Sequence, residues 1–299
     1  MSPPPPWGGQ TSSSSSMERT APVRSIYQSR NGFESEALDM LFYFSATGNS
    51  KRTAEIIAER TGDRLVSISG SLADGRSTFD ASSDDRIGFV IPTYFYNPPK
   101  AVMRFVEGLE IAGCEGKYAY VVLTLGTRTG TAGRTLAKAL AEKGVDVVAQ
   151  FCVRTQYTYI PSLDVPGDDE LNVILDEADA DSRKIAEQVA SFEKGDFNRF
   201  AGTVAAAVSP SMKAAYEKAS ATSNFTLSDG CDGCGVCAEV CPDRVISVED
   251  GRPVWNADSC TLCLACLHRC PRAAIDLGES TAGKRRYTNP RTEMPVGPI

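Results

Sequence analysis

The chain has 299 residues, a net charge of −7 and a pI near 5.0, and this acidic balance argues against nucleic acid as a partner. Its length allows two domains and a sizeable core. The one histidine, His268, leaves no basis for a histidine triad or a histidine-rich metal site, and we expect it to be a packing or solvated residue. No apolar run approaches the length that spans a bilayer, so no transmembrane segment is expected.

Residues 1–39 are predicted to be a disordered N-terminal extension. The stretch contains Pro3 to Pro6 and Ser12 to Ser16, which are of low complexity and cannot bury a core. A secretory signal peptide is the competing interpretation, but it requires a continuous apolar stretch that this segment lacks. The folded pattern starts at Met40, which is a candidate for the true start of the protein.

From residue 40 to residue 194, apolar strand-like runs alternate with helix-like segments. Five buried strands separated by helices predict an α/β fold with a doubly wound parallel sheet that is covered on both faces. Residues 69–84 are polar and rich in Ser, Asp and Gly, and they are predicted to be a loop. The predicted strands are 40–44, 64–68, 87–91, 118–125 and 145–153, and the predicted helices lie near 49–61, 98–109, 130–143 and 169–194.

A hydroxyl-rich loop follows the first predicted strand, and a helix begins directly after it. Free amides and the positive end of the helix dipole favour an anion at such a junction. Gly48 allows the backbone to come close to a ligand, and the spacings of a Walker loop and of a dinucleotide-binding glycine motif are not present. A loop without a cation at its centre suits a monophosphate ester, and its candidate contacts are Ser45, Thr47, Gly48, Asn49 and Ser50.

Residues 195–228 are predicted to be a linker with a short helix. Ser209 and Pro210 are residue types favoured at the N-cap and the first helical position, and the helix is expected to run to about Ser220. Residues 279–299 are predicted to be a solvated tail. A basic docking patch at Lys284-Arg285-Arg286 is the alternative interpretation of that tail.

Between the linker and the tail, residues 229–278 contain one cysteine pattern twice, with an offset of 29 residues. Each copy reads C-x2-C-x2-C-x3-C-P, the run that binds 4Fe-4S clusters in bacterial ferredoxins, so two clusters are expected. Three thiolates on one tight loop wrap a corner of a cluster, and the fourth cysteine starts a helix that leads to the other cluster. The pattern therefore predicts one ligand group of Cys231, Cys234, Cys237 and Cys270 and a second of Cys241, Cys260, Cys263 and Cys266.

Other roles for these eight cysteines fit the sequence less well. Disulfides need an oxidising compartment, which the lack of a secretory signal does not support. Zinc sites usually use pairs of cysteines rather than triplets. Cys114 and Cys152 stand apart from the motifs, and we expect both to be small core residues.

Residues 40–278 together resemble fusion proteins that join a flavodoxin-like domain, residues 40–194, to a small α+β bacterial-type 2[4Fe-4S] ferredoxin domain, residues 229–278. Ser-x-Thr-Gly-Asn-Ser after the first strand resembles the FMN phosphate loop of flavodoxins. Asn97 stands where flavodoxin aromatic loops often carry Gly, and Asn tolerates a positive φ better than most residues. The resemblance implies FMN contacts from Thr93, Tyr94, Phe95, Tyr96 and Asn97 in one loop and from Gly126, Thr127 and Gly130 in the next.

The aromatic residues near the predicted flavin site have two interpretations. Tyr157 and Tyr159 follow the fifth strand and are further candidates to line the flavin site. For each of these aromatic side chains, ordinary core packing is an equally open alternative.

Three functions are compatible with the sequence. The first is an electron-transfer iron-sulfur flavoprotein that passes electrons between two 4Fe-4S clusters and FMN and links one-electron partner proteins to two-electron chemistry. The second is a ferredoxin-dependent flavin reductase that acts on a small-molecule substrate, with residues 154–170 shaping its pocket and Arg154 and Tyr157 as candidate proton donors or anion-binding groups. The third is an iron-sulfur protein whose flavodoxin-like domain no longer binds FMN.

The expected partners are donor and acceptor redox proteins, with a small-molecule acceptor under the second function. No acid–base pair is evident, so no catalytic residue is assigned. A thiol-rich chain without a secretory signal fits a reducing cytoplasm, and the oxygen sensitivity of exposed clusters favours an anaerobic or low-oxygen host.

Overall fold

The computed structural model describes residues 39–202 and 205–294 of the chain. The predictions for residues 1–38 and for the last five residues of the tail fall outside these described residues. Across the described ranges, no helix is both long enough and apolar enough to cross a membrane.

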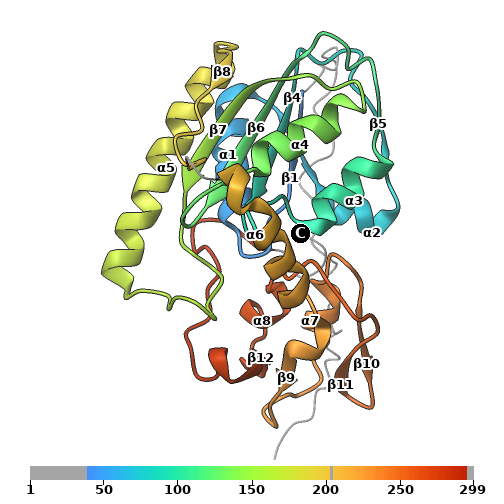
Figure 1. The fold of residues 1–299 in the computed structure, drawn as a ribbon, viewed down its shortest axis with the longest axis vertical. Helices are drawn as coiled ribbons and strands as arrows, with labels where there is room; N and C mark the ends of the chain where they lie inside the picture. The colour runs from blue at the N-terminus through green and yellow to red at the C-terminus, as the bar shows by residue number, and fades with distance from the viewer. Residues whose placement is uncertain (1–38, 203–204, 295–299) are drawn as a thin grey trace, which may run out of the picture. The chain divides into compact units, whose positions relative to one another are not determined.

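Six parallel strands form the central sheet, in the order β2-β1-β4-β6-β7-β8 (Figure 1). The first five strands follow the 2-1-3-4-5 order of flavodoxin-like doubly wound sheets. The predicted five-stranded flavodoxin-like sheet is therefore confirmed, and β8 adds a short edge strand beside β7. The strands are β1 Met40–Tyr43, β2 Arg64–Ser67, β4 Arg86–Pro92, β6 Tyr118–Leu125, β7 Val147–Arg154 and β8 Gly195–Asp196.

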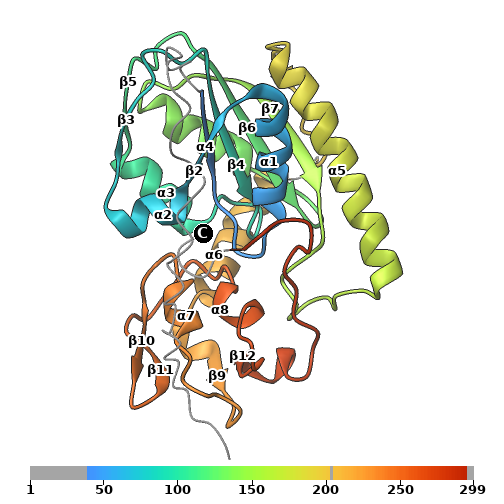
Figure 2. The same ribbon diagram turned by 180° about the vertical axis from the view of Figure 1, so that it is seen from behind.

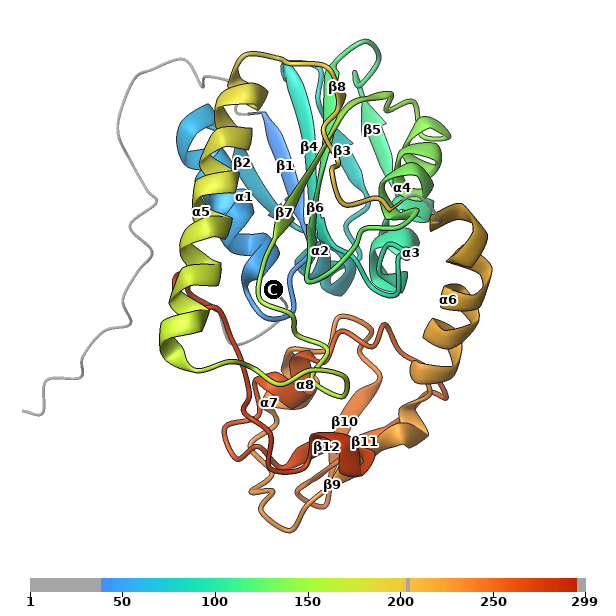
Figure 3. The ribbon, with the colours of Figure 1, turned by 60° about the vertical axis from the view of Figure 1, so that its left-hand side comes forward.

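Helices cover both faces of this sheet (Figure 3). Successive residues of a strand point to opposite faces, and β1 illustrates this alternation: Met40 and Phe42 belong to one core, whereas Leu41 and Tyr43 belong to the other. One face carries α1 Asn49–Thr61 and α5 Asp168–Ala190, and the other carries α2 Ile68–Asp74, α3 Lys100–Gly108 and α4 Ala132–Ala141.

The predicted loop at residues 69–84 is wrong, because this stretch contains α2 and the strand β3 Thr78–Asp80. Ser67 caps α2 by accepting a hydrogen bond from the Gly70 amide at 2.9 Å, which gives a polar stretch a defined helix start. The strand pairs in parallel with β5 Glu110–Ala112. Phe79 enters the core edge-on to Phe42, with ring centroids 4.9 Å apart, so one aromatic side chain anchors the segment.

The predicted linker helix is present, but it begins earlier than expected. It is α6, Ala205–Ala219, and Pro210 lies inside it rather than at its first position. Ser209 does not act as its N-cap, because it lies inside the helix, and its Oγ lies 3.0 Å from the Thr131 Oγ1 of the sheet half. Tyr216 of the same helix donates a hydrogen bond to the carbonyl of Thr261 at 2.7 Å, so α6 contacts both halves of the molecule.

The cysteine-rich part consists of two short helices and two antiparallel strand pairs. The internal repeat is visible in the fold, because the two four-residue helices occupy equivalent places in the two copies. The limits of the separate domains stay a prediction. The elements are α7 Val236–Glu239, α8 Ala265–His268, the pair of β9 Phe225–Leu227 with β12 Ile275–Leu277, the hairpin of β10 Ile246–Glu249 with β11 Arg252–Trp255, and the 3-10 turns Thr222–Asn224 and Gly278–Thr281.

The described part of the tail is not a solvated end, which corrects the prediction. It runs beside α1 and α5 of the sheet half (Figure 2), and Tyr287 is 3% exposed. The alternative of a basic docking patch fails as well, because each cation of the predicted patch has an internal partner. The ion pairs are Lys284–Asp164, Arg285–Asp168 and Arg286–Asp276.

Candidate functional site

A cavity of about 270 Å³ lies at the carboxyl ends of β1, β4, β6 and β7, and we call it the large cavity. Ligands of doubly wound sheets bind at this edge. Met212 of α6 and residues 262–264 of the cysteine-rich part complete its wall. Gly48, Asn97 and Gly130 were predicted contacts but do not line it. The predicted contacts that do line it are Ser45, Thr47, Asn49, Ser50, Thr93, Tyr94, Phe95, Tyr96, Gly126 and Thr127.

The hydroxyl-rich loop after β1 is held in shape by its own side chains. Ser45 Oγ accepts a hydrogen bond from the Gly48 amide at 3.1 Å, and Ser50 Oγ lies 2.7 Å from Thr124 Oγ1 at the end of β6. These bonds fix the loop at the start of α1, where unpaired amides and the helix dipole favour an anion. The loop therefore has the local structure that the phosphate-site prediction requires.

The side chains of this loop differ in what they can still offer a ligand. Asn49 Nδ2 already donates to the carbonyl of Gln156 at 3.0 Å. Lys51 Nζ lies 2.6 Å from Glu55 Oε1, so this neighbouring cation is neutralised by a carboxylate. Thr47 is a buried residue that lines the cavity, and its hydroxyl makes no hydrogen bond within the described residues. Thr47 is accordingly the side chain of the loop that is best placed to bind a ligand.

The aromatic loop after β4 is a tight turn with backbone strain. Tyr94 and Asn97 exchange two backbone hydrogen bonds of 2.9 Å, and the two residues between them have positive φ angles, 49° at Phe95 and 65° at Tyr96. The expectation that Asn97 takes the positive φ is therefore wrong. Asn97 instead donates from Nδ2 to the carbonyl of Phe95 at 2.6 Å. Such strain costs about 1–3 kcal/mol per residue and is typical of functional sites.

Two of the predicted flavin-contacting glycines provide space for tyrosines. A Cβ atom at Gly126 would lie 2.1 Å from the ring of Tyr157, and one at Gly130 would lie 2.2 Å from the Cβ of Tyr96. Tyr157 and Tyr96 both line the cavity, so these glycines shape its aromatic wall from behind. Thr93 Oγ1 is buried in the same wall and has no partner within the described residues, as expected of a group that a ligand completes.

Each predicted group of four cysteines surrounds a cavity of its own. Among the described residues, no three His, Cys, Asp or Glu side chains gather closely enough to hold a single metal ion. Cys234 is exposed to solvent, whereas the other group lies deeper. We call the cavity of Cys231, Cys234, Cys237 and Cys270 the outer cysteine cavity, and the cavity of Cys241, Cys260, Cys263 and Cys266 the inner cysteine cavity.

Burial raises the pKa of several thiols in the two cavities. It raises the pKa of Cys237 to about 11 and that of Cys260 to about 12, and it also holds the pKa of Cys263 and Cys266 well above the usual value. Because iron binds the thiolate form, loading either cavity would release protons. The donor set fits 4Fe-4S clusters, since each cavity offers four cysteine sulfurs.

The two cysteine loops differ at equivalent positions of the repeat. Gly233 and Gly235 have φ angles of 73° and 80°, and their counterparts Leu262 and Leu264 adopt φ angles of 52° and 59°. A leucine in this left-handed region costs about 1–2 kcal/mol, so the second loop is strained. Both leucines are buried and line the large cavity together with Cys263, and Leu264 and Cys263 also line the inner cysteine cavity. The two cavities therefore share a wall.

The single histidine is a buried packing residue that ties three segments together, so the packing prediction is confirmed. His268 Nδ1 accepts a hydrogen bond from the Tyr287 amide at 3.2 Å, so its Nε2 carries the proton that is donated to the carbonyl of Thr158 at 2.8 Å. Burial lowers the pKa of His268 to about 4. Cys114 and Cys152 are buried in the sheet half, as predicted for core residues.

Sequence reasoning missed several residues of the large cavity. Arg128 follows β6 and lies exposed at its rim, and Met212 comes from the linker helix, where no sequence signal marks it. Leu262 and Leu264 did carry a signal, because leucines replace glycines when the two cysteine motifs are aligned. Arg154, a candidate of the substrate-pocket interpretation, does not line the cavity and lies over the ring of Phe200 at 4.4 Å.

Residues 230–287 match the family described as "4Fe-4S dicluster domain". This part of the chain is a 4Fe-4S dicluster domain. A stretch of 49 residues is 41% identical to one of the subunits of the Na(+)-translocating ferredoxin:NAD(+) oxidoreductase complex of Acetobacterium woodii. The alignment covers 16% of this chain and 15% of that relative, so the chain spans about a seventh of the curated protein that it matches.

Solved flavodoxin structures align with the other half of the chain. Flavodoxin 2 from Bacillus cereus is 18% identical, with a TM-score of 0.37, and the alignment covers 52% of this chain and 99% of that one. A flavodoxin from the domain Archaea is 19% identical, with a TM-score of 0.31, and the alignment covers 51% of this chain and 99% of that one. The fold assignment of this half rests on its strand order rather than on these scores.

Proposed function

We propose that this protein is an electron-transfer iron-sulfur flavoprotein that passes electrons between two 4Fe-4S clusters and FMN. The cysteines of the outer and inner cavities would hold the clusters, and the loops after β1, β4 and β6 would hold FMN. FMN exchanges one or two electrons and a 4Fe-4S cluster exchanges one, so the chain would join one-electron partner proteins to two-electron chemistry.

The observation that carries this proposal is the wall shared by the large cavity and the inner cysteine cavity. Cys263 and Leu264 line both, so a cluster ligand would border the flavin site directly. Burial around Cys266 and the apolar side chains of Leu262 and Leu264 would keep water out of this passage. A route between the two cofactors would then need no further protein.

The outer cysteine cavity is the proposed contact point for a redox partner. Cys234 is exposed there, and the adjoining Asp229 and Asp232 are exposed acidic residues. Acidic groups around such a site attract a partner with a basic surface and speed its encounter at low salt. The donor and acceptor would thus be proteins, with the clusters on the receiving side.

Anaerobic purification with quantitation of iron, sulfide and flavin tests this proposal. About eight irons per chain are expected from two four-iron clusters, together with one FMN. Reduction through a partner ferredoxin should then bleach the flavin absorbance, and removal of the outer cluster should slow this bleaching. Eight irons without FMN, even after FMN is added, would refute the proposal and favour a domain that no longer binds flavin.

Thr47 tests the phosphate loop separately from the clusters. Thr47→Val removes the unpartnered hydroxyl, and loss of a hydrogen bond to a charged phosphate should raise the FMN Kd by about tenfold or more. Thr78→Val, the same change at an exposed site on β3, is the matched control. Iron content should stay unchanged in both variants. Equal FMN binding by the two would remove Thr47 from the site.

A second candidate function is a ferredoxin-dependent reductase that acts on a small molecule at the flavin. The observation that favours it is the exposed guanidinium of Arg128 at the cavity rim, which would suit an anionic or carbonyl-bearing acceptor. Turnover of small acceptors by the reduced protein would support this function. Oxidation by partner proteins alone would support the electron carrier.

A further inference from the structure

The tail that follows the dicluster fold returns to the phosphate loop, and we call residues 284–294 the C-terminal strap. Its backbone meets the loop directly, because the amide of Asn289 donates to the carbonyl of Thr47 at 2.7 Å. Its side chains continue this contact: Tyr287 Oη donates to Asn49 Oδ1 at 2.6 Å, and Asn289 Nδ2 donates to the same oxygen at 3.1 Å. Tyr287 and Asn289 are both buried.

These contacts hold both polar atoms of the Asn49 side chain. Its Oδ1 accepts from the two strap residues, while its Nδ2 donates to the carbonyl of Gln156 in the loop after β7. Asn49 is the first residue of α1 and lines the large cavity. The strap therefore determines how the start of α1 is held at the place where an anion would bind.

Gly48 shows that the strap and the loop are shaped for each other. Gly48 has a φ of 98° and does not line the cavity. A Cβ atom there would lie 2.9 Å from Asn289 Cβ, 2.9 Å from Thr292 Cγ2 and 3.2 Å from Met294 Sδ. The sequence predicted that Gly48 lets the backbone come close to the ligand. In the structure, the missing side chain of Gly48 instead lets the strap come close to the loop.

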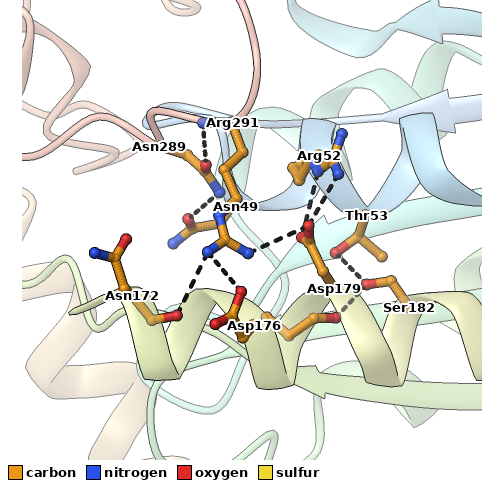
Figure 4. A network of polar contacts seen from close by, with 10 residues as sticks. Asn49, Arg52, Thr53, Asn172, Asp176, Asp179, Ser182, Asn289 and Arg291 are labelled. Atoms are coloured by element: carbon orange, nitrogen blue, oxygen red, sulfur yellow. Dashed lines mark hydrogen bonds and ion pairs between the residues drawn. The ribbon is translucent and has the colours of Figure 1, made fainter. Parts of the chain in front are cut away.

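Towards its C-terminal end, at Arg291, the strap is anchored to α5 through charged groups (Figure 4). Arg291 Nη2 lies 2.7 Å from Asp176 Oδ1, and Arg291 Nη1 lies 3.4 Å from Asp179 Oδ2. Asp179 is 6% exposed and also accepts from Arg52 Nη2 of α1 at 2.9 Å. One buried carboxylate therefore links α1, α5 and the strap, which keeps the strap against the loop.

Towards its N-terminal end, at Tyr287, the strap is anchored to the dicluster domain. The Tyr287 amide donates to His268 Nδ1 on α8, the helix that carries Cys266 of the inner cysteine cavity. Tyr287 itself packs in the core cluster that contains Cys241 and Cys266. The same residue thus contacts the ligand-bearing helix of one domain and the anion loop of the other.

We propose that Tyr287 and Asn289 are positioning residues for the FMN phosphate, and that through them the dicluster domain completes the flavin site. The inference rests on the proposed binding of FMN. The strap holds Asn49 and the start of α1, which would face the phosphate, whereas Tyr287 and Asn289 make no hydrogen bond to Tyr96 or Tyr157 within the described residues. The strap should therefore affect recognition of the phosphate and not of the flavin ring.

A comparison of two flavins in the cluster-loaded protein tests the inference. FMN and riboflavin share the ring, but riboflavin lacks the phosphate, and both affinities can be measured by quenching of flavin fluorescence. The double variant Tyr287→Phe/Asn289→Ala should raise the FMN Kd about tenfold, the effect of roughly one lost hydrogen bond, and change the riboflavin Kd by less than about twofold. Tyr287→Phe alone removes a single hydroxyl and should show part of the effect.

Tyr118→Phe is the matched control. It removes another buried tyrosine hydroxyl, which donates to the carbonyl of Glu193 at 2.6 Å and lies outside the cavity. Iron content and circular dichroism verify that all variants are folded. A parallel loss of FMN and riboflavin in Tyr287→Phe would overturn the inference, as would unchanged FMN binding in the double variant. If the wild type binds neither flavin, the proposed function and this inference fail together, whereas failure in the variants alone overturns only the inference.

Discussion

The two cysteine loops have the same spacing of ligands but opposite surroundings. In the outer loop, Gly233 and Gly235 take left-handed conformations at little cost, and Cys234 faces solvent. In the inner loop, Leu262 and Leu264 take those conformations despite their side chains, and both are buried against the large cavity. The strain of the inner loop is thus offset by burial, about 1.5–3 kcal/mol for each leucine.

This difference indicates that the two copies of the motif have different roles. Under the proposed function, the exposed Cys234 would let a partner protein approach the outer cysteine cavity. The buried leucines of the second loop join the inner cysteine cavity to the proposed flavin site. The predictions below test whether the two loops differ in this way.

The largest effect is expected from removing one ligand of each group. Cys266→Ala and Cys237→Ala should each lower iron from about eight to about four per chain, because each cluster needs four cysteines. Both cysteines are 8% exposed, so they form a matched pair. Only Cys266→Ala should also weaken FMN binding, since only its loop lines the large cavity. Iron analysis and flavin fluorescence measure both effects. An equal loss of FMN in the two variants would contradict different roles for the two loops.

A smaller effect is expected from exchanging the residues in left-handed conformations. Leu264→Gly relieves about 1–2 kcal/mol of strain but loses a buried side chain whose removal typically costs about 2–5 kcal/mol, so a net destabilisation of about 2 kcal/mol is expected. Gly235→Ala is the outer counterpart and should cost only the strain, about 1 kcal/mol, because its Cβ would lie at an ordinary 3.9 Å from Val248 Cγ2.

Anaerobic denaturant unfolding of the loaded proteins gives these differences. Leu264→Gly should in addition weaken FMN binding, whereas Gly235→Ala should not, because Gly235 lines only the outer cysteine cavity. A Leu264→Gly protein that is more stable than the wild type would show that burial does not offset the strain.

The smallest effect concerns the charges beside the two loops. Asp243 accepts hydrogen bonds from the amide and the hydroxyl of Thr261, and its negative charge adds to the effect of burial in raising the pKa of Cys260. Removing that charge favours an added electron, so Asp243→Asn should raise the reduction potential of the inner cluster by on the order of 50 mV.

Asp232→Asn is the outer counterpart of this change. Each aspartate has an arginine partner, at 2.7 Å for Asp232 and 2.9 Å for Asp243. The Asp232 side chain is 38% exposed and that of Asp243 only 7%, so solvent screens the charge of Asp232 more and the shift should be much smaller. Potentiometric titration followed by electron paramagnetic resonance measures both clusters. Equal shifts in the two variants would mean that the inner cluster is as solvated as the outer one.

Much of this molecule was predictable from local sequence patterns. The helix predicted at residues 49–61 and the strand at 118–125 match α1 and β6, because buried parallel strands and capped helices leave strong patterns. The predicted loop at 69–84 was wrong, because a side-chain cap at Ser67 and the burial of Phe79 outweigh a polar composition. In the turn after β4, the positive φ angles fall on Phe95 and Tyr96 and not on Asn97, the residue type that tolerates them better.

The sequence by itself determined the five main strands, the helices α1, α3, α4 and α5, the two cysteine groups and the loop at the start of α1, because a strong sequence pattern marks each of them. The tertiary structure alone decided which cysteine cavity borders the large cavity and where the tail goes. Asn49 and Tyr287 are far apart in sequence yet share a hydrogen bond of 2.6 Å, and no local pattern encodes such a pair. Contacts of this kind arise only when two folded surfaces bury their side chains against each other, so they appear with packing and not before it.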